Sequence, residues 1–127
     1  MAWPASVTLR AWIWMVRVEW RRRRDSFDDL VAWLESVPQG ERRSVPAARV
    51  LVAVRRAYAL SPFHPSCLKV SLVALGLLRS LGHPARLAIG VKPLAGALDA
   101  HAWLEVDGAP LDPKAPSYAP LRWPGSI

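Results

Sequence analysis

The chain has 127 residues, of which 52% are hydrophobic, so it is long enough for one domain with a buried core, too short for two, and too apolar for a disordered protein. Its single cysteine excludes an intramolecular disulfide and a zinc site built from cysteines, and a lone thiol is typical of a reducing compartment. The formal net charge of +7 predicts an acidic partner, such as an acidic peptide, a nucleic acid or an anionic lipid surface.

The N-terminal segment superficially resembles a signal or membrane segment. Residues 7–16 are mostly apolar, but Arg10 interrupts them and no apolar run reaches the roughly 18 residues that a membrane span needs. Arg21–Arg24 stand where a small-residue cleavage site would follow. The sequence therefore predicts a cytoplasmic protein, and it leaves open a contact of this segment with a membrane surface.

The same segment has helical periodicity over residues 7–23. Leu9, Ile13 and Val16 fall on one side, with Trp12, Met15 and Trp20 close by, and this wide apolar stripe predicts that the helix packs against another part of the protein. The following Arg21–Arg24 run has two interpretations. It is either a solvated helix end, where cations suit the helix dipole, or a surface that meets an acidic partner.

Three more helices are predicted before residue 82. The first begins near Asp25 and ends at 38–40, and the second begins at 44–46 with Ser44 as a cap and a proline in its first turn. The third spans about residues 65–81 and is apolar on nearly all sides, so it is expected to be buried. Neither of the first two carries chemistry that the sequence identifies.

The periodicity then changes to that of strands. Short strands are predicted over residues 85–92, 100–106 and 109–112, and 93–97 are expected to form a loop. Asp107-Gly108 is a strong signal for a two-residue hairpin turn. We expect a single domain over 1–127, made of an N-terminal helical region (1–43), a core (44–113) and a proline-rich surface tail (114–127).

Cys67 falls in the first turn of the predicted central helix, whether Ser66 or His64 is the cap. The partial positive charge of a helix start favours a thiolate and leaves backbone N–H groups free to hold an oxyanion. The alternative is that Cys67 is a small buried hydrophobic residue. Its position at a helix start, away from the core stripes, favours the nucleophile.

The predicted hairpin selects a histidine and an aspartate. With a turn at Asp107-Gly108, Trp103 pairs with Asp112, and His101 shares the face of Trp103 because strand side chains alternate. Asp112 then lies diagonal to His101, at a backbone spacing of about 7–8 Å that side chains can bridge. An aspartate there can orient the imidazole and stabilise its charged form. The alternative is a carboxylate that caps the turn before Pro113.

Three other acids compete for the same role. Asp107 lies in the turn, roughly 20 Å from His101, and Glu105 lies about 13 Å along the strand. Asp99 is expected to point to the opposite face. The geometry therefore selects Asp112.

The remaining candidates are weaker. His64, three residues before Cys67, is either a substrate-binding residue or a simple turn residue, and His83 is expected to be a surface turn residue after Gly82. Trp103 is expected to form an apolar wall beside the site and to contact substrate. No local ligand spacing predicts a metal site, and no Gly-rich loop predicts a phosphate or cofactor site.

Three segments together carry a family resemblance: Cys67-Leu68 at a helix start, Leu-Leu-Arg-Ser-Leu-Gly-His-Pro-Ala-Arg-Leu-Ala-Ile-Gly-Val over residues 77–91, and Ala-His-Ala-Trp-Leu-Glu-Val-Asp-Gly over 100–108. The combination resembles the transglutaminase-like cysteine peptidases and, more narrowly, the B2 leader peptidases of lasso peptide biosynthesis, over roughly residues 45–113. The resemblance implies an α+β, transglutaminase-like or papain-like fold. In it, the helix with Cys67 packs on a small antiparallel sheet that carries His101 and Asp112.

The resemblance also implies an activity and its partners. A Cys-His-Asp triad would remove the leader from a ribosomally made lasso precursor peptide before an ATP-dependent cyclase closes the macrolactam. The leader would be held by a separate B1 recognition protein, and it commonly has threonine as its penultimate residue. No cofactor is implied.

Two other functions stay open. One is a transglutaminase-like acyl transferase that uses the same three residues. The other is a non-catalytic basic module that binds nucleic acid or an acidic protein through Arg21–Arg24 and Arg42-Arg43. Since no known nucleic-acid motif is present, nucleic acid is not expected as a partner.

Overall fold

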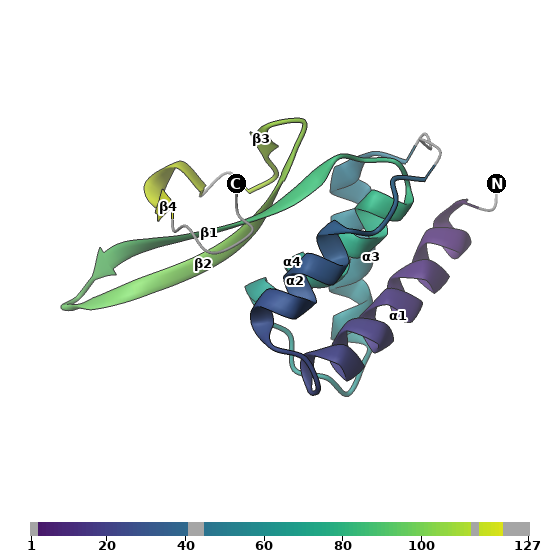
Figure 1. Ribbon diagram of the computed structural model, residues 1–127, viewed down its shortest axis with the longest axis horizontal. Coiled ribbons are helices and arrows are strands. Elements are labelled where there is room, and N and C mark those ends of the chain that lie inside the picture. The colour runs from purple at the N-terminus through teal and green to yellow at the C-terminus, as the bar shows by residue number, and fades with distance from the viewer. Residues whose placement is uncertain (1–2, 41–44, 113–114, 121–127) are drawn as a thin grey trace.

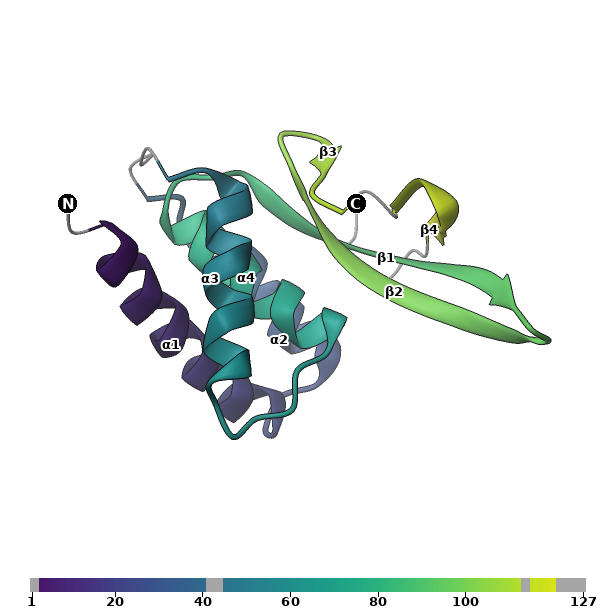
Figure 2. The same cartoon turned by 180° about the vertical axis from the view of Figure 1, so that it is seen from behind.

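The computed structural model describes residues 3–40, 45–112 and 115–120. Four helices come first in the chain and an antiparallel sheet follows, which confirms the predicted α+β class. The helices gather at one end of the molecule, and the long hairpin of the sheet projects away from them (Figure 1, Figure 2). The elements are α1 (Trp3–Arg22), α2 (Phe27–Glu35), α3 (Ala47–Ala59), α4 (Cys67–Ser80), β1 (Ala85–Leu94), β2 (Ala97–Val106), β3 (Ala109–Pro110), a 3-10 turn (Ala115–Ser117) and β4 (Ala119–Pro120).

The helix α4 is the centre of the packing. It contacts each of the other three helices and both long strands. Every residue from Ser71 to Leu78 is buried, as expected for a helix that is apolar on nearly all sides. At Gly76 the backbone of α4 comes so close to α1 that an added Cβ would lie 2.6 Å from the ring of Trp14.

The helix α1 packs against α3 and α4 as predicted, but only part of its wide apolar stripe enters the core. Leu9, Ile13 and Val16 point outward, with exposed fractions of 62%, 49% and 53%. The helix is apolar around most of its circumference, so periodicity alone does not identify the core side, whereas the contact of Trp14 with Gly76 does. Neither α1 nor any other helix in the described part of the chain is long and apolar enough to cross a membrane. The residues of α1 that enter the core are Val7, Ala11, Trp14, Met15 and Val18.

The hairpin of β1 and β2 is longer than the sequence predicts. Pairing runs without a break from Ala85 opposite Val106 to Leu94 opposite Ala97. The expected loop over residues 93–97 is therefore wrong, because only Ala95 and Gly96 turn, with φ of 50° and 82°. Positive φ at both turn residues matches the twist of the flanking strands, so the ladder continues to the tip of the hairpin.

The second turn of the sheet follows the prediction. Asp107 and Gly108 both have positive φ, and Val106 pairs with Ala109. The strand β3 is only two residues long, yet the N–H of Leu111 still donates to the carbonyl of Leu104 at 2.9 Å. The predicted register therefore extends as far as Leu111, the residue before Asp112. On the other edge of the sheet β4 pairs with β1, giving the order β3-β2-β1-β4.

Some predictions fall on residues outside this description. They are the cap at Ser44, the Arg42-Arg43 pair and most of the proline-rich tail. The helix α3 begins at Ala47, and Pro46 occupies its N-cap position without a side-chain hydrogen bond. The division into residues 1–43, 44–113 and 114–127 stays a prediction.

Candidate active site

Cys67 is the first residue of α4 and is exposed. The N-cap is Ser66, whose hydroxyl accepts a hydrogen bond from the N–H of Lys69 at 3.1 Å. Of the two caps that the sequence allows, the structure thus uses Ser66 and not His64. A thiol at this position lies next to backbone N–H groups at the positive end of the helix dipole.

His101 and Asp112 are hydrogen-bonded to each other. The contact joins Nε2 of His101 to Oδ2 of Asp112, and each side chain is about four-fifths buried, with exposed fractions of 20% and 19%. The contact follows from the Asp107-Gly108 turn, which brings the chain back along β2 in the register described above. The other ring nitrogen of His101, Nδ1, does not make this contact.

Cys67, His101 and Asp112 line one cavity of about 270 Å³. One wall comes from α3, through Leu51 and Arg55, and the others come from the start of α4 and from β2. A second hollow of about 190 Å³ shares Cys67 and His101. Its other walls are apolar, namely Leu68, Ile89, Ala100 and Ala102. The thiol and the imidazole therefore border two hollows, one of mixed polarity and one apolar.

Trp103 forms a wall of the larger cavity, as the sequence predicts. Its ring is stacked with that of His101, with centroids 6.1 Å apart, and its side chain is 6% exposed. The indole N–H is buried and has no hydrogen-bond partner among the described residues. A buried N–H without a partner is costly in free energy.

Tyr118 is a residue of this site that the sequence did not indicate. Its ring lies 5.2 Å from that of His101 and 6.2 Å from that of Trp103. Its hydroxyl donates to Oδ2 of Asp99 at 2.7 Å, and this bond raises the pKa of Tyr118 above its ordinary value of 10.0. Tyr118 lies in a short turn between prolines, where no periodicity places a side chain. Only the pairing of β4 with β1 brings it to His101.

The expected orientation of Asp99 is wrong. Residues 99 and 101 are two apart on β2 and so lie on the same face. Tyr118 spans the two, since it contacts the carboxylate of Asp99 and the ring of His101. Asp99 accepts a hydrogen bond from Tyr118, whereas Asp112 is hydrogen-bonded to His101.

The other two histidines are placed differently from the catalytic candidate. His64 is exposed, lines neither hollow, and uses its carbonyl to accept a bond from Nζ of Lys69 at 2.7 Å. The prediction that His83 lies on the surface is wrong, because its side chain is buried and its Nε2 lies 2.8 Å from the carbonyl oxygen of Val45. Gly82, with φ of 88°, turns the chain sharply after α4 and directs the ring inward.

The described residues contain no group of three or more His, Cys, Asp or Glu side chains that could hold a metal ion. The candidate chemistry is that of a thiol in one cavity with an imidazole–carboxylate pair. This is the arrangement used in nucleophilic catalysis of acyl transfer and hydrolysis.

Comparison with known families agrees with this geometry. The model of the Transglutaminase-like superfamily matches residues 12–122. The chain belongs to this superfamily. The match covers Cys67, His101 and Asp112, and it also includes most of α1 and the tail as far as β4. No curated protein and no solved structure gives a significant match.

Proposed function

We propose that this transglutaminase-like protein is a cysteine peptidase that removes the leader from a ribosomally made lasso precursor peptide. The observation that carries the proposal is the hydrogen-bonded pair of His101 and Asp112 in the cavity that Cys67 lines. Superfamily membership supports a cysteine-based enzyme. The leader-peptidase assignment rests on the resemblance of residues 77–91 and 100–108 to the B2 proteins.

The proposed reaction begins with a proton transfer from the thiol of Cys67 to Nδ1 of His101. Asp112 stabilises the imidazolium through Nε2–H. The thiolate attacks the scissile carbonyl, and backbone N–H groups at the start of α4 stabilise the oxyanion. His101 then gives its proton to the leaving amine as the C–N bond breaks, which leaves a thioester on Cys67. Water hydrolyses the thioester, and the thiol is restored.

Trp103 has a proposed role in substrate binding. Trp103 lines the cavity, and its indole N–H is buried without a partner among the described residues. A substrate carbonyl or the developing oxyanion would satisfy it, which makes it a candidate side-chain donor. No such observation favours His64, so its predicted substrate contact is not part of this proposal.

The proposed substrate is the junction between the leader and the core of the precursor peptide. The hollow formed by Leu68, Ile89 and Ala100 suits a small, partly apolar side chain such as the threonine that commonly stands in the penultimate position of these leaders. The proposed partners are a separate B1 protein, which presents the leader, and the ATP-dependent cyclase that acts next. The cytoplasm is the proposed compartment, since the precursor is made there.

The test is cleavage of a lasso precursor peptide in the presence of B1, followed by mass spectrometry. Wild type should release leader and core with the gain of one water, and Cys67→Ala should release neither. Full cleavage by Cys67→Ala would refute the proposal. Nucleic-acid binding that weakens steeply with salt and survives the loss of Cys67 and His101 would instead support the basic binding module.

Membership of the Transglutaminase-like superfamily favours acyl transfer as the second candidate function. The thioester on Cys67 would then be attacked by an amine instead of water. Adding a primary amine such as glycinamide to the same assay separates the two reactions. A leader that carries the mass of the amine indicates transfer, and the free acid indicates hydrolysis.

A further inference from the structure

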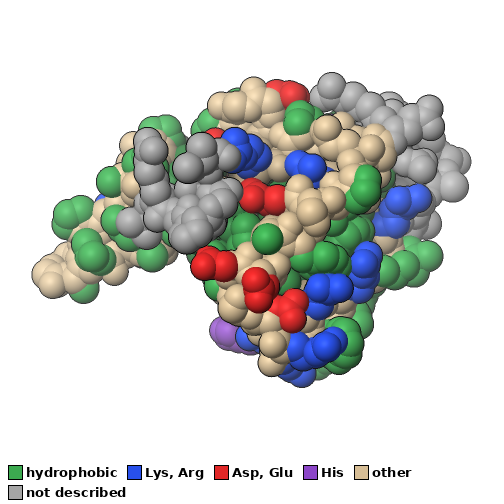
Figure 3. Space-filling model, in the orientation of Figure 1, with side chains coloured by type: hydrophobic (Ala, Val, Ile, Leu, Met, Phe, Trp, Pro, Cys, Tyr) green, Lys and Arg blue, Asp and Glu red, His purple; other side chains and the backbone are tan. Residues whose placement is uncertain are grey.

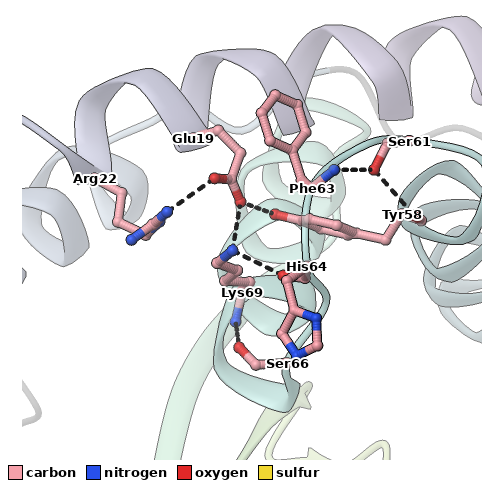
Figure 4. Close-up of polar contacts among 8 residues, drawn as sticks. All are labelled: Glu19, Arg22, Tyr58, Ser61, Phe63, His64, Ser66 and Lys69. Atoms are coloured by element: carbon pink, nitrogen blue, oxygen red, sulfur yellow. Dashed lines mark hydrogen bonds and ion pairs between the residues drawn. The ribbon is translucent and has the colours of Figure 1, made fainter.

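A buried carboxylate joins three helices close to the candidate nucleophile. Glu19 of α1 is 2% exposed. It accepts a hydrogen bond from the hydroxyl of Tyr58 on α3 at 3.0 Å, and it forms an ion pair with Nζ of Lys69 on α4 at 3.3 Å (Figure 4). Arg22, one turn further along α1 and more exposed, donates a hydrogen bond from its guanidinium to Oε1 of Glu19 at 3.0 Å.

Lys69 connects this cluster to the segment that ends at Cys67. Its Nζ also donates to the carbonyl of His64 at 2.7 Å, and its backbone N–H donates to the hydroxyl of Ser66. Figure 4 shows Lys69 between Glu19 on one side and His64 with Ser66 on the other. His64, two residues before the cap, and the cap itself are therefore both hydrogen-bonded to Lys69, which lies two residues after the thiol.

The charge state of the cluster is fixed by its contacts. Burial alone would raise the pKa of Glu19, but hydrogen bonds from Arg22, Tyr58 and Lys69 outweigh it and hold this pKa below its usual value of 4.5. Burial, together with the carboxylate of Glu19, raises the pKa of Tyr58 far above its ordinary value. At neutral pH the carboxylate is charged and the phenol is neutral, so both can make the bonds described.

We propose that Glu19 is a positioning residue for the thiol, acting through Lys69 on residues 64–66 and hence on Cys67. The inference rests on the proposed function, because it assigns Glu19 to the same reaction. Buried ion pairs often add little stability compared with apolar replacements, and in some proteins they serve instead to fix one arrangement of the chain. A shift of about 1 Å in a reacting atom can cost about 100-fold in rate.

The test compares Glu19→Gln and Lys69→Met with two controls. Arg22→Gln removes only the more exposed partner of Glu19, and Val31→Ala removes core volume on α2 and lowers stability without touching the cluster. The measurements are kcat and KM for precursor cleavage and the pH profile of Cys67 alkylation by iodoacetamide. All are normalised to the folded fraction.

We expect kcat to fall about 10- to 100-fold in Glu19→Gln and Lys69→Met, with a changed alkylation profile and little change in KM. The controls should stay within about twofold of wild type. Wild-type behaviour of Glu19→Gln and Lys69→Met, or an equal loss in Val31→Ala, would overturn the inference. If wild type itself neither cleaves precursor nor shows alkylation that depends on His101, the proposed function fails instead.

The outward face of α1 supports an independent inference. Leu9, Ile13, Val16 and Trp20 lie at intervals of four, three and four residues, with exposed fractions of 62%, 49%, 53% and 60%. Residues with this spacing share one side of a helix. The opposite side of α1 is in the core, so the stripe, defined by these four residues, is a second apolar face.

The exposed charged residues of α1 are all basic. Arg10 is next to Leu9 in the sequence, and Arg24 lies over the ring of Trp20 at 4.2 Å, whereas Arg17 lies over the rings of Trp14 and Trp33. The only acid of α1 is Glu19, which is buried in the cluster described above. A second copy of the chain docked on this face would bring arginines against arginines, which is unfavourable. Figure 3 shows basic and apolar side chains next to each other along the right-hand side of the molecule, where Figure 1 places α1.

We infer that this face binds the surface of an anionic lipid bilayer. Interfacial helices combine aliphatic residues and tryptophan with flanking arginines, and they need no hydrogen-bond complement from their partner. The stripe offers apolar side chains alone, whereas interfaces with acidic proteins carry many hydrogen bonds. The net charge of +7 also favours attraction to an anionic surface.

The test is co-sedimentation with vesicles of phosphatidylcholine, with and without 30% phosphatidylserine. Wild type should bind only the anionic vesicles, and more weakly as salt rises. Ile13→Glu should lower this binding at least tenfold, while Leu98→Glu, at a still more exposed position on the β1–β2 hairpin (72%), should not. Absence of wild-type binding, or equal binding by Ile13→Glu, would overturn the inference. So would a dimer that Ile13→Glu dissociates in the absence of vesicle binding.

Discussion

Gly90 of β1 lies directly opposite His101 of β2 in the register of the hairpin. A Cβ at Gly90 would lie 2.7 Å from the ring of Trp103 and 2.7 Å from the Cβ of Tyr118. The missing side chain therefore provides the space in which both rings approach His101. Its backbone is extended, so the requirement for glycine here is one of space and not of φ.

Gly90→Ala should be destabilising and should lower activity. Overpacking of a well-packed site costs about 1–3 kcal/mol, and the displaced rings would move His101. Urea unfolding and precursor cleavage measure the two effects. The double variant Gly90→Ala, Trp103→Leu should lose less stability than the sum of its single changes, because the larger ring is absent. Additive losses would show that the contact with Trp103 is not the cause.

Asp112→Asn should lower kcat with little effect on KM. The amide can still contact His101 but does not stabilise the imidazolium, and general acid–base catalysis is worth about 100- to 10,000-fold. Steady-state cleavage of the precursor measures both constants. Asp99→Asn is the matched control, since Asp99 contacts Tyr118 and is expected to matter less. Equal losses in the two variants would contradict the role given to Asp112.

Local sequence rules were enough to predict the pairing of His101 with Asp112. The Asp107-Gly108 turn sets the register, the register sets the face, and the hydrogen bond follows. The position of Cys67 at a helix start was likewise predictable from Ser66 and the prolines before it. Both inferences need only interactions between residues near in the chain or across one hairpin.

Three features that the sequence did not predict depend on distant contacts. The core side of α1 is set by Gly76 of α4, and Tyr118 reaches His101 only through a two-residue strand. His83 is buried against Val45, which lies just before α3 and whose carbonyl oxygen is 2.8 Å from Nε2 of His83. Periodicity contains no information on such pairings, since each depends on where another element packs.

The stability that Glu19 provides should depend on pH. Its folded-state pKa is below the unfolded value of about 4.5, so its contribution is present above pH 4.5 and is lost as pH falls through the folded-state value. The difference in unfolding free energy between wild type and Glu19→Gln should therefore shrink between pH 7 and pH 3. Urea unfolding at both pH values measures it. A difference that stays constant or grows in acid would show that Glu19 is not held as the carboxylate.

Trp103→Phe should lower activity without a matching loss of stability. The variant keeps an aromatic ring beside His101 but removes the buried indole N–H that has no partner among the described residues. Removing the unsatisfied donor stabilises the fold, whereas the smaller ring of Phe loses some packing. The net unfolding free energy is expected to stay unchanged or to rise by about 1 kcal/mol.

The activity of the same variant should fall if the N–H meets the substrate. Loss of one oxyanion donor lowers kcat about 100- to 1,000-fold, whereas loss of packing alone would act through stability. Cleavage assays below the unfolding temperature separate the two, and Trp14→Phe, which changes a tryptophan on α1 against α4, controls for ring size in the core. If Trp103→Phe keeps full kcat, the indole N–H has no part in the reaction, and the donors at the start of α4 act alone.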